Sequence, residues 1–157
     1  MTTFAQLSLA GLHGLDQDQA NRLCVLLVLH LEIDRGLSWR LHMAARGNPT
    51  DETAIPSADE LRALQRQTFA DRFKAAVDAG IVIAEHELAI RALNLVRNDL
   101  VHVRLGERRL HVNPAISRPA TFDALYDSVA RACDALYEPI VKLLRAPGPG
   151  EGWEDVG

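Results

Sequence analysis

"DQDQANRLCVLLVLHLEIDRGLSWRLHMAAR", residues 16–46, is the stretch that decides the fold class. It opens on Asp16 and Gln19, an Asp-x-x-Gln capping signature in which each side chain can bond the backbone amide of the other residue. Leucines then recur at helical spacing, at positions 23, 27, 31 and 37. We therefore expect one long helix from residue 16 toward residue 46.

A second helix is expected from residue 57 to about 79. Ser57 and Glu60 have the spacing of a capping box, and an apolar stripe at helical spacing follows them. Gly80 suits the left-handed backbone conformation that often ends a helix. Between the first two helices, residues 46–57 collect glycine, asparagine and two prolines, which predicts a loop.

Two more helices are expected farther along the chain, over about 84–100 and about 119–144. Pro139 should bend the last helix, because proline cannot donate a backbone hydrogen bond to Ala135. We predict an all-α fold, an up-and-down bundle of four to five helices over residues 16–145.

The segments outside these helices are less regular. Residues 1–15 are expected to form an N-terminal arm. Residues 146–157 are rich in proline and glycine and should form a disordered tail. Residues 101–112 allow a short β-hairpin, because Gly106 fits the first position of a type II′ turn and valine and leucine alternate with charged residues on both arms.

Composition and charge exclude several classes of protein. The chain of 157 residues fits one domain, and 48% hydrophobic and 24% charged residues are typical of a globular protein. The longest apolar run, residues 23–33, is too short to span a bilayer, and the N-terminus lacks the pattern of a secretory signal. We therefore expect a cytoplasmic protein without a membrane partner.

Residues 91–118 carry six arginines against two acidic residues, a net charge of +4, in a chain whose total is −4. This charge pattern favours a focused anion site.

Polar residues form a narrow stripe on the helix expected at 84–100. At about 100° per residue, three- and four-residue spacings place four of them on one line, and Arg97 and Asp99 lie at its two margins. The rest of the helix surface is mostly apolar, so it should be buried against its own bundle and a second subunit, with the stripe facing a cleft. The four residues of the stripe are Arg91, Asn94, Asn98 and His102.

Residues 97–102, Arg-Asn-Asp-Leu-Val-His, resemble the R-x4-6-H signature of the HEPN superfamily (higher eukaryotes and prokaryotes nucleotide-binding), in which a polar residue, often asparagine, follows the arginine. In that family the signature ends a late helix of a small all-α bundle, after a segment similar to residues 69–96. The resemblance extends over roughly residues 57–145. It implies a homodimer whose paired motifs form a cleft, used in many members for metal-independent RNA cleavage and in others for binding alone.

The resemblance also implies roles for individual residues. His102 is the expected general acid or base, Arg97 the expected stabiliser of charge on phosphorus, and Asn98 the residue that orients the histidine. These residue types suit the chemistry, because imidazole titrates near neutral pH and guanidinium stays charged. The resemblance also implies a toxin-like ribonuclease with an antitoxin or other protein partner. One toxin group has a modifiable tyrosine two positions after the histidine, where this chain has Arg104.

Helix geometry leaves two arrangements open. Arg97 and His102 are separated by about 140° of rotation and about 7.5 Å of rise, so they do not share a face of a straight helix. If the chain forms the hairpin instead, His102 lies opposite His111 and Arg104 lies opposite Arg109, which makes a cationic face. The candidate substrate-binding residues are Asn98, Arg91, Asn94, Arg104, Arg109 and His111, and Asp99 is a candidate orienting residue.

A structural interpretation competes with the ribonuclease. His102 can cap a helix C-terminus, and Arg97 and Asp99 can pair at the rim of an interface, in a regulatory or interaction module without catalysis. His30 and His42 are expected to be packed or surface residues rather than ligands. The chain has no Glu-x-x-His motif and no CxxC pair, so no metal and no cofactor is expected.

Overall fold

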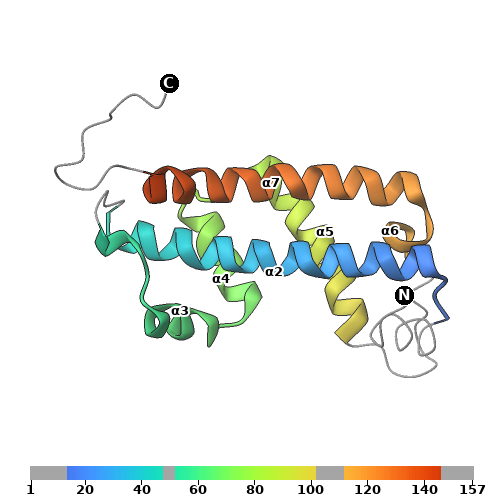
Figure 1. Ribbon diagram of the computed structural model, residues 1–157, viewed down its shortest axis with the longest axis horizontal. Coiled ribbons are helices and arrows are strands. Elements are labelled where there is room, and N and C mark those ends of the chain that lie inside the picture. Colours follow the sequence, from blue (N-terminus) through green and yellow to red (C-terminus); the bar gives the residue numbers. More distant parts are fainter. Residues whose placement is uncertain (1–13, 48–51, 102–111, 146–157) are drawn as a thin grey trace.

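The computed structural model describes residues 14–47, 52–101 and 112–145, and these residues are helical with short connections (Figure 1). The described ranges contain six α-helices and one 3-10 turn, and no strand. The all-α prediction is therefore confirmed for the described residues. The expected N-terminal arm, hairpin and tail lie almost entirely outside them.

The longest helix is α2, Gln17–Ala45, and it begins as its sequence predicts. The Asp16 carboxylate accepts from the backbone amide of Gln19 at 2.8 Å, and the Asp16 amide donates to the Gln19 side chain at 3.0 Å. These two bonds satisfy amides that have no partner within the helix. A 3-10 turn, η1 (Glu52–Ala54), follows in the loop region.

The single helix expected over residues 57–79 is wrong, because the structure has two helices there. α3 is Ala58–Gln65, capped by Ser57 and Glu60 as expected, and α4 is Phe69–Asp78. Thr68 starts α4 by accepting from the amide of Asp71 at 3.2 Å, so the chain stops and restarts a helix within three residues. Gly80 then ends this region with a positive φ of 71°.

Three helices complete the described chain. α5 is Ala84–Val101 and α7 is Pro119–Arg145, both close to the predicted bounds. The one-turn helix α6, Pro114–Ser117, lies between them, and Asn113 caps it. The split of the second helix and the presence of α6 explain why the described residues hold more helices than the four to five expected.

α2 and α7 lie side by side and run in the same direction (Figure 1). Arg22 near the start of α2 donates to the Ile116 carbonyl just before α7, and Glu32 farther along accepts from Tyr137. α5 packs against both long helices and crosses obliquely behind α2 (Figure 1). In an up-and-down bundle of four the first and last helices are antiparallel, so the four-helix form of the predicted bundle does not match this course. The physical reason is that α3 and α4 are too short to make a full return pass.

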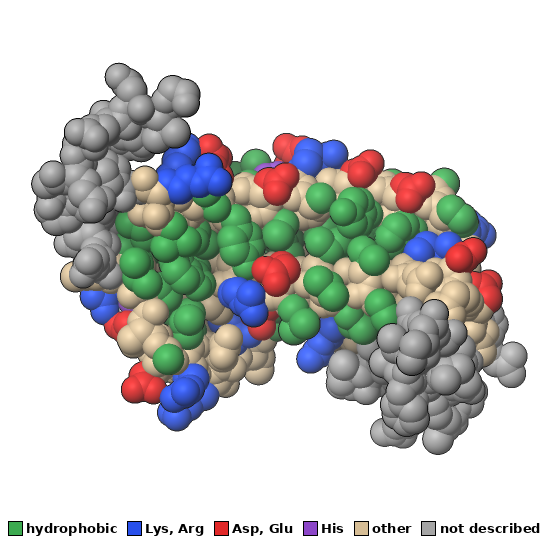
Figure 2. All heavy atoms as spheres, in the orientation of Figure 1, with side chains coloured by type: hydrophobic (Ala, Val, Ile, Leu, Met, Phe, Trp, Pro, Cys, Tyr) green, Lys and Arg blue, Asp and Glu red, His purple; other side chains and the backbone are tan. Residues whose placement is uncertain are grey.

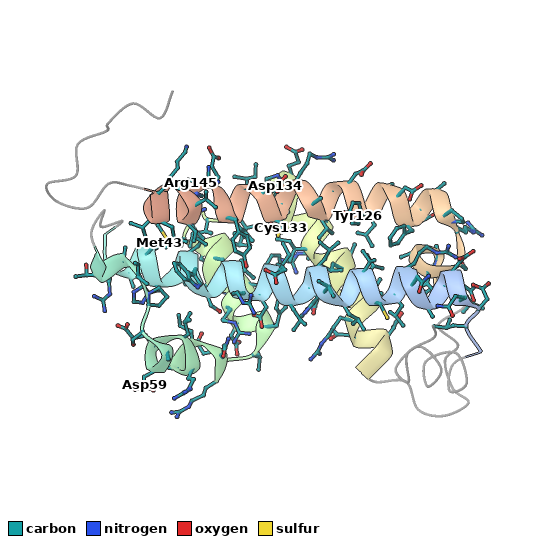
Figure 3. The ribbon with its side chains drawn as sticks, viewed as in Figure 1. Met43, Asp59, Tyr126, Cys133, Asp134 and Arg145 are labelled. Atoms are coloured by element: carbon teal, nitrogen blue, oxygen red, sulfur yellow. The ribbon has the colours of Figure 1, made fainter. Side chains whose placement is uncertain are left out.

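The main core lies where α2, α5 and α7 meet. α3 lies on the side of α2 away from α7 (Figure 1) and contributes no fully buried residue. Hydrophobic side chains also line the seam between α2 and α7 on the face shown in Figure 2. In Figure 3, Tyr126 and Cys133 lie on the side of α7 toward α2, and Asp134 points away. The largest fully buried apolar side chains are Leu23, Leu26, Ile33, Leu37, Ile90, Leu93, Ile116 and Val129.

Pro139 remains inside a continuous helix, and α2 supplies what the proline removes. Without an amide at Pro139, the carbonyl of Ala135 has no donor four residues ahead. Arg40 of α2 donates from Nη1 to that carbonyl at 3.3 Å and to the Leu136 carbonyl at 3.5 Å. A cation from the neighbouring helix therefore satisfies the carbonyl that proline leaves without its helical partner.

In the described ranges no helix is long and apolar enough to cross a membrane. Cys24 and Cys133 are free thiols, each only half-buried. Burial, with nearby Glu32 and Asp134, raises the pKa of the Cys133 thiol.

Candidate nucleic-acid site

Two open hollows flank α4, each with a volume of about 650 Å³, which is large enough for a nucleotide. The Arg97 hollow lies between α2, the start of α4 and α5. It is lined by Leu27, His30, Leu31, Asp34, Gln67, Thr68, Phe69, Arg72 and Arg97. The Arg91 hollow lies between α4 and α5. It is lined by Ala70, Phe73, Lys74, Val77, Asp78, Arg91, Asn94 and Leu95.

In the Arg97 hollow, Arg97 is the cation that remains available to a ligand. It comes from the last turns of α5 and is half-buried. Its Nη1 donates to the side-chain oxygen of Asn98 at 3.1 Å. Among the described residues it forms no ion pair with a carboxylate. A guanidinium held by a neutral amide keeps its charge and most of its donors for an anion.

His30 lies beside Arg97 but comes from α2. Its Nε2 is 3.2 Å from the Asn94 side-chain oxygen, and its ring packs on Phe69 with 4.4 Å between centroids. Only 6% of its surface is exposed. Burial lowers the pKa of His30, and the charges of Arg97 and Arg72 lower it further, against the Asn94 hydrogen bond and Asp34, which raise it. The neutral ring is therefore the favoured form at neutral pH.

Arg72 and Asp34, which both line the same hollow, form an ion pair. Nε of Arg72 donates to the Asp34 carboxylate at 2.9 Å, and only 4% of the Arg72 side chain is exposed. Nη1 of Arg72 donates to the carbonyls of Leu64 and Gln67, at the break between α3 and α4. Arg72 is thus fully engaged by protein groups. The pair is neutral overall, so Arg97 gives the hollow its net positive charge.

Arg91 belongs to the other hollow and has a carboxylate partner. It donates to Glu87 at 2.9 and 2.6 Å, and its guanidinium lies 5.2 Å from the centre of the Phe73 ring. Asn94 lines this hollow too, and through its bond to His30 it connects the two hollows. The predicted polar stripe is thus divided between two surfaces.

Asp99 contacts the segment that precedes α6. Its carboxylate accepts from the Asn113 side chain at 3.1 Å, while the Asn113 oxygen accepts from the amide of Ala115 at 3.0 Å. Asp99 therefore helps to position the start of α6. His102, Arg104, Arg109 and His111 lie outside the described residues.

Among the residues that line the Arg97 hollow, Arg97 of α5 was predicted from the sequence as a site residue, whereas those of α2 and α4 were not. His30 was expected to be a packed or surface residue, and Asp34 and Arg72 were not considered. One signal was available: His30 and Asp34 are four residues apart on α2, so two polar side chains share one helix face within a largely apolar run.

Comparison with protein-family models, with curated proteins and with solved structures found no match to this chain. In the described ranges no three histidine, cysteine, aspartate or glutamate side chains gather as a metal site.

Proposed function

We propose that the chain is a HEPN-like protein that binds RNA or a nucleotide at the C-terminal part of α5 and cleaves RNA without metal. The observation that carries the proposal is Arg97, a half-buried guanidinium in an open hollow, bound to Asn98 and to no described carboxylate. A structural arginine usually has a carboxylate or a carbonyl of another element as its partner, as Arg72 and Arg40 have here, and among the described residues Arg97 has no such partner. An arginine without one is suited to a phosphate.

In the proposed reaction Arg97 binds the non-bridging oxygens of the phosphate under attack. The ribose 2′-hydroxyl gives up its proton as its oxygen bonds to phosphorus, and the 5′-oxygen gains a proton as its bond to phosphorus breaks. His102, as general base or acid, takes the first proton or supplies the second. Arg97 stabilises the negative charge that builds on the phosphate oxygens, so most of the rate enhancement comes from positioning and electrostatics. The products are a 2′,3′-cyclic phosphate and a 5′-hydroxyl.

The proposed active unit is a homodimer. Leu88 and Leu95 lie seven residues apart on one face of α5 and are 74% and 65% exposed. Side chains of this size on the motif-bearing helix suit a partner surface. The resemblance to HEPN proteins implies a dimer in which the two motifs lie side by side.

The test is RNA cleavage in excess chelator by the wild type, Arg97→Ala and His102→Ala. We expect a loss of about 100-fold or more in each variant. Arg131→Ala, an exposed arginine of α7 outside both hollows, is the matched control and should cleave like the wild type. Cleavage that persists in both site variants would refute the catalytic role.

A toxin-like function has its own test. Induced expression of the wild type should arrest growth of a host, and His102→Ala should relieve the arrest. Growth arrest by both proteins would separate toxicity from the proposed site.

The second candidate is a dimeric interaction or regulatory module in which the polar cluster is structural. The pairs Arg91–Glu87, Asn94–His30 and Asp99–Asn113 favour it, because each engages a predicted site residue with a protein partner. Thermal melting and RNA binding distinguish the two candidates. A large loss of stability in Arg97→Ala, with RNA binding unchanged, favours the module.

A further inference from the structure

The Arg97 hollow contains a buried hydrogen-bond acceptor, Nδ1 of His30, that has no part in the proposed reaction. The side-chain oxygen of Asn94 can only accept, so Nε2 of a neutral His30 carries the proton and donates to it. Nδ1 then keeps its lone pair. Among the described residues Nδ1 of His30 has no hydrogen-bond partner, although the side chain lines the hollow and is almost fully buried. A buried polar atom without a protein partner usually meets water or a ligand.

The surroundings of His30 define which ligand group can reach it. Arg97, which also lines the hollow, carries the positive charge, since Arg72 and Asp34 neutralise each other. Phe69 and the 65% exposed Leu31 add apolar surface at the rim. A ligand that fits has an anionic group for Arg97, a neutral hydroxyl donor for Nδ1 and a flat apolar face for the rim. A ribonucleotide unit combines these three groups.

We propose that Nδ1 of His30 accepts a hydrogen bond from the 2′-hydroxyl of a ribonucleotide whose phosphate is bound by Arg97. This assignment rests on the proposed function and deepens it, because it names a residue of α2 that distinguishes RNA from DNA at the site. The 2′-hydroxyl is the group that differs between the two nucleic acids, and a fixed acceptor reads it directly. Asn94 is the positioning residue, since its hydrogen bond sets the tautomer and the orientation of the ring.

The test uses a ribonucleoside 3′-monophosphate and its 2′-deoxy counterpart, which have no 5′-linked leaving group and so survive the measurement. Wild-type protein should bind the ribose form about three- to tenfold more tightly, as one hydrogen bond allows. Calorimetry with each ligand gives this ratio.

His30→Gln separates the ligand role from the structural role. Glutamine places an amide nitrogen near the position of Nε2, so it can still donate to Asn94, but it has no acceptor at the position of Nδ1. We expect the variant to bind both ligands with the affinity of the wild type for the deoxy form. Arg97→Ala should weaken both ligands by the same factor and leave their ratio unchanged.

A second measurement needs no variant. The Nδ1 resonance of His30 in nitrogen-labelled wild-type protein should shift on addition of the ribose ligand and stay in place with the deoxy ligand. Equal binding of both ligands, without a selective shift, overturns the role of His30 and leaves the proposed function standing. Failure of the wild type to bind either ligand overturns both.

Discussion

Arg72, the partner of Asp34 in an ion pair, donates four hydrogen bonds to protein groups near the candidate site. Arg72 closes the break between α3 and α4 by bonding two carbonyls, and it joins α4 to α2 through Asp34. Because the guanidinium is buried, the loss of any of these hydrogen bonds leaves a polar atom with neither a protein partner nor water. The pair therefore maintains the shape of the Arg97 hollow rather than binding a ligand.

This role predicts the effect of removing one partner. Arg72→Met leaves the Asp34 carboxylate unpaired, and that side chain is 25% exposed, so solvent screens part of the loss. We expect the free energy of unfolding to fall by about 3 kcal/mol, measured by urea denaturation. The double variant Arg72→Met with Asp34→Leu should lose less than the two single losses combined. Strict additivity would show that the ion pair does not couple the two helices.

His30 predicts a pH dependence of stability. Its pKa in the folded chain lies below the ordinary value of 6.5 that it has when unfolded, so the unfolded state binds the proton first. The contribution of neutral His30 is complete above pH 6.5 and is lost as the pH falls through the folded pKa. Thermal melting from pH 8 to 5 should show a steeper decline for the wild type than for His30→Gln.

At lower pH the dependence of stability on pH has a separate origin, Glu60. Hydrogen bonds from Ser57 lower the pKa of Glu60 to about 2, with a further contribution from Arg46. The stability that ionised Glu60 contributes through these bonds is present above pH 4.5 and is lost as the pH falls toward 2.

Parallel melting-temperature curves for wild type and His30→Gln between pH 7 and 5 would contradict the role given to His30.

At the scale of elements, the starts and ends of helices were the most predictable features. Asp16 and Ser57 each cap a helix by bonding the backbone amide three residues ahead, and Gly80 takes the left-handed conformation expected of it. Such signals are local, so a sequence contains them in full. The break before Thr68 was missed although Thr68 is itself a local cap, and the carbonyls at the break are satisfied by Arg72, a contact that the sequence does not show.

The contact between Arg40 and the α7 backbone gives an element-scale prediction. Arg40→Ala should lower the free energy of unfolding by about 1–3 kcal/mol, because the Ala135 carbonyl then loses its donor. In the background of Pro139→Ala the amide at 139 returns, so the loss from Arg40→Ala should shrink. A double-mutant cycle by chemical denaturation measures the difference. Equal losses in both backgrounds would rule out the link between Arg40 and the proline.

At the scale of the whole molecule, the sequence predicted helices better than their arrangement. Nothing local fixes the direction of α7 relative to α2, since that follows from how many full passes the chain makes between them. The site was limited in the same way. Arg97, Asn98 and Asn94 share α5 and were found together, whereas His30 lies 64 residues from its partner Asn94 and Asp34 lies 38 residues from Arg72.

The proposed homodimer is tested at this scale. Leu88→Glu combined with Leu95→Glu places two charges on the exposed face of α5 and should convert a dimer into a monomer in sedimentation velocity, with little change in helicity. Leu144→Glu is the matched control, because Leu144 is 58% exposed on α7, away from α5. A dimer that survives the double change does not use this face.

The parallel course of α2 and α7 limits how the chain can be rewired. The 27 residues of α7 span about 40 Å, so Arg145 lies that far along the molecule from the end where both long helices begin. Circular permutation that joins residue 145 to residue 17 therefore needs a connector of at least about 12 extended residues. The same separation suits a pair of fluorescent labels at the two ends, whose energy transfer would report on unfolding along the full length of the helices.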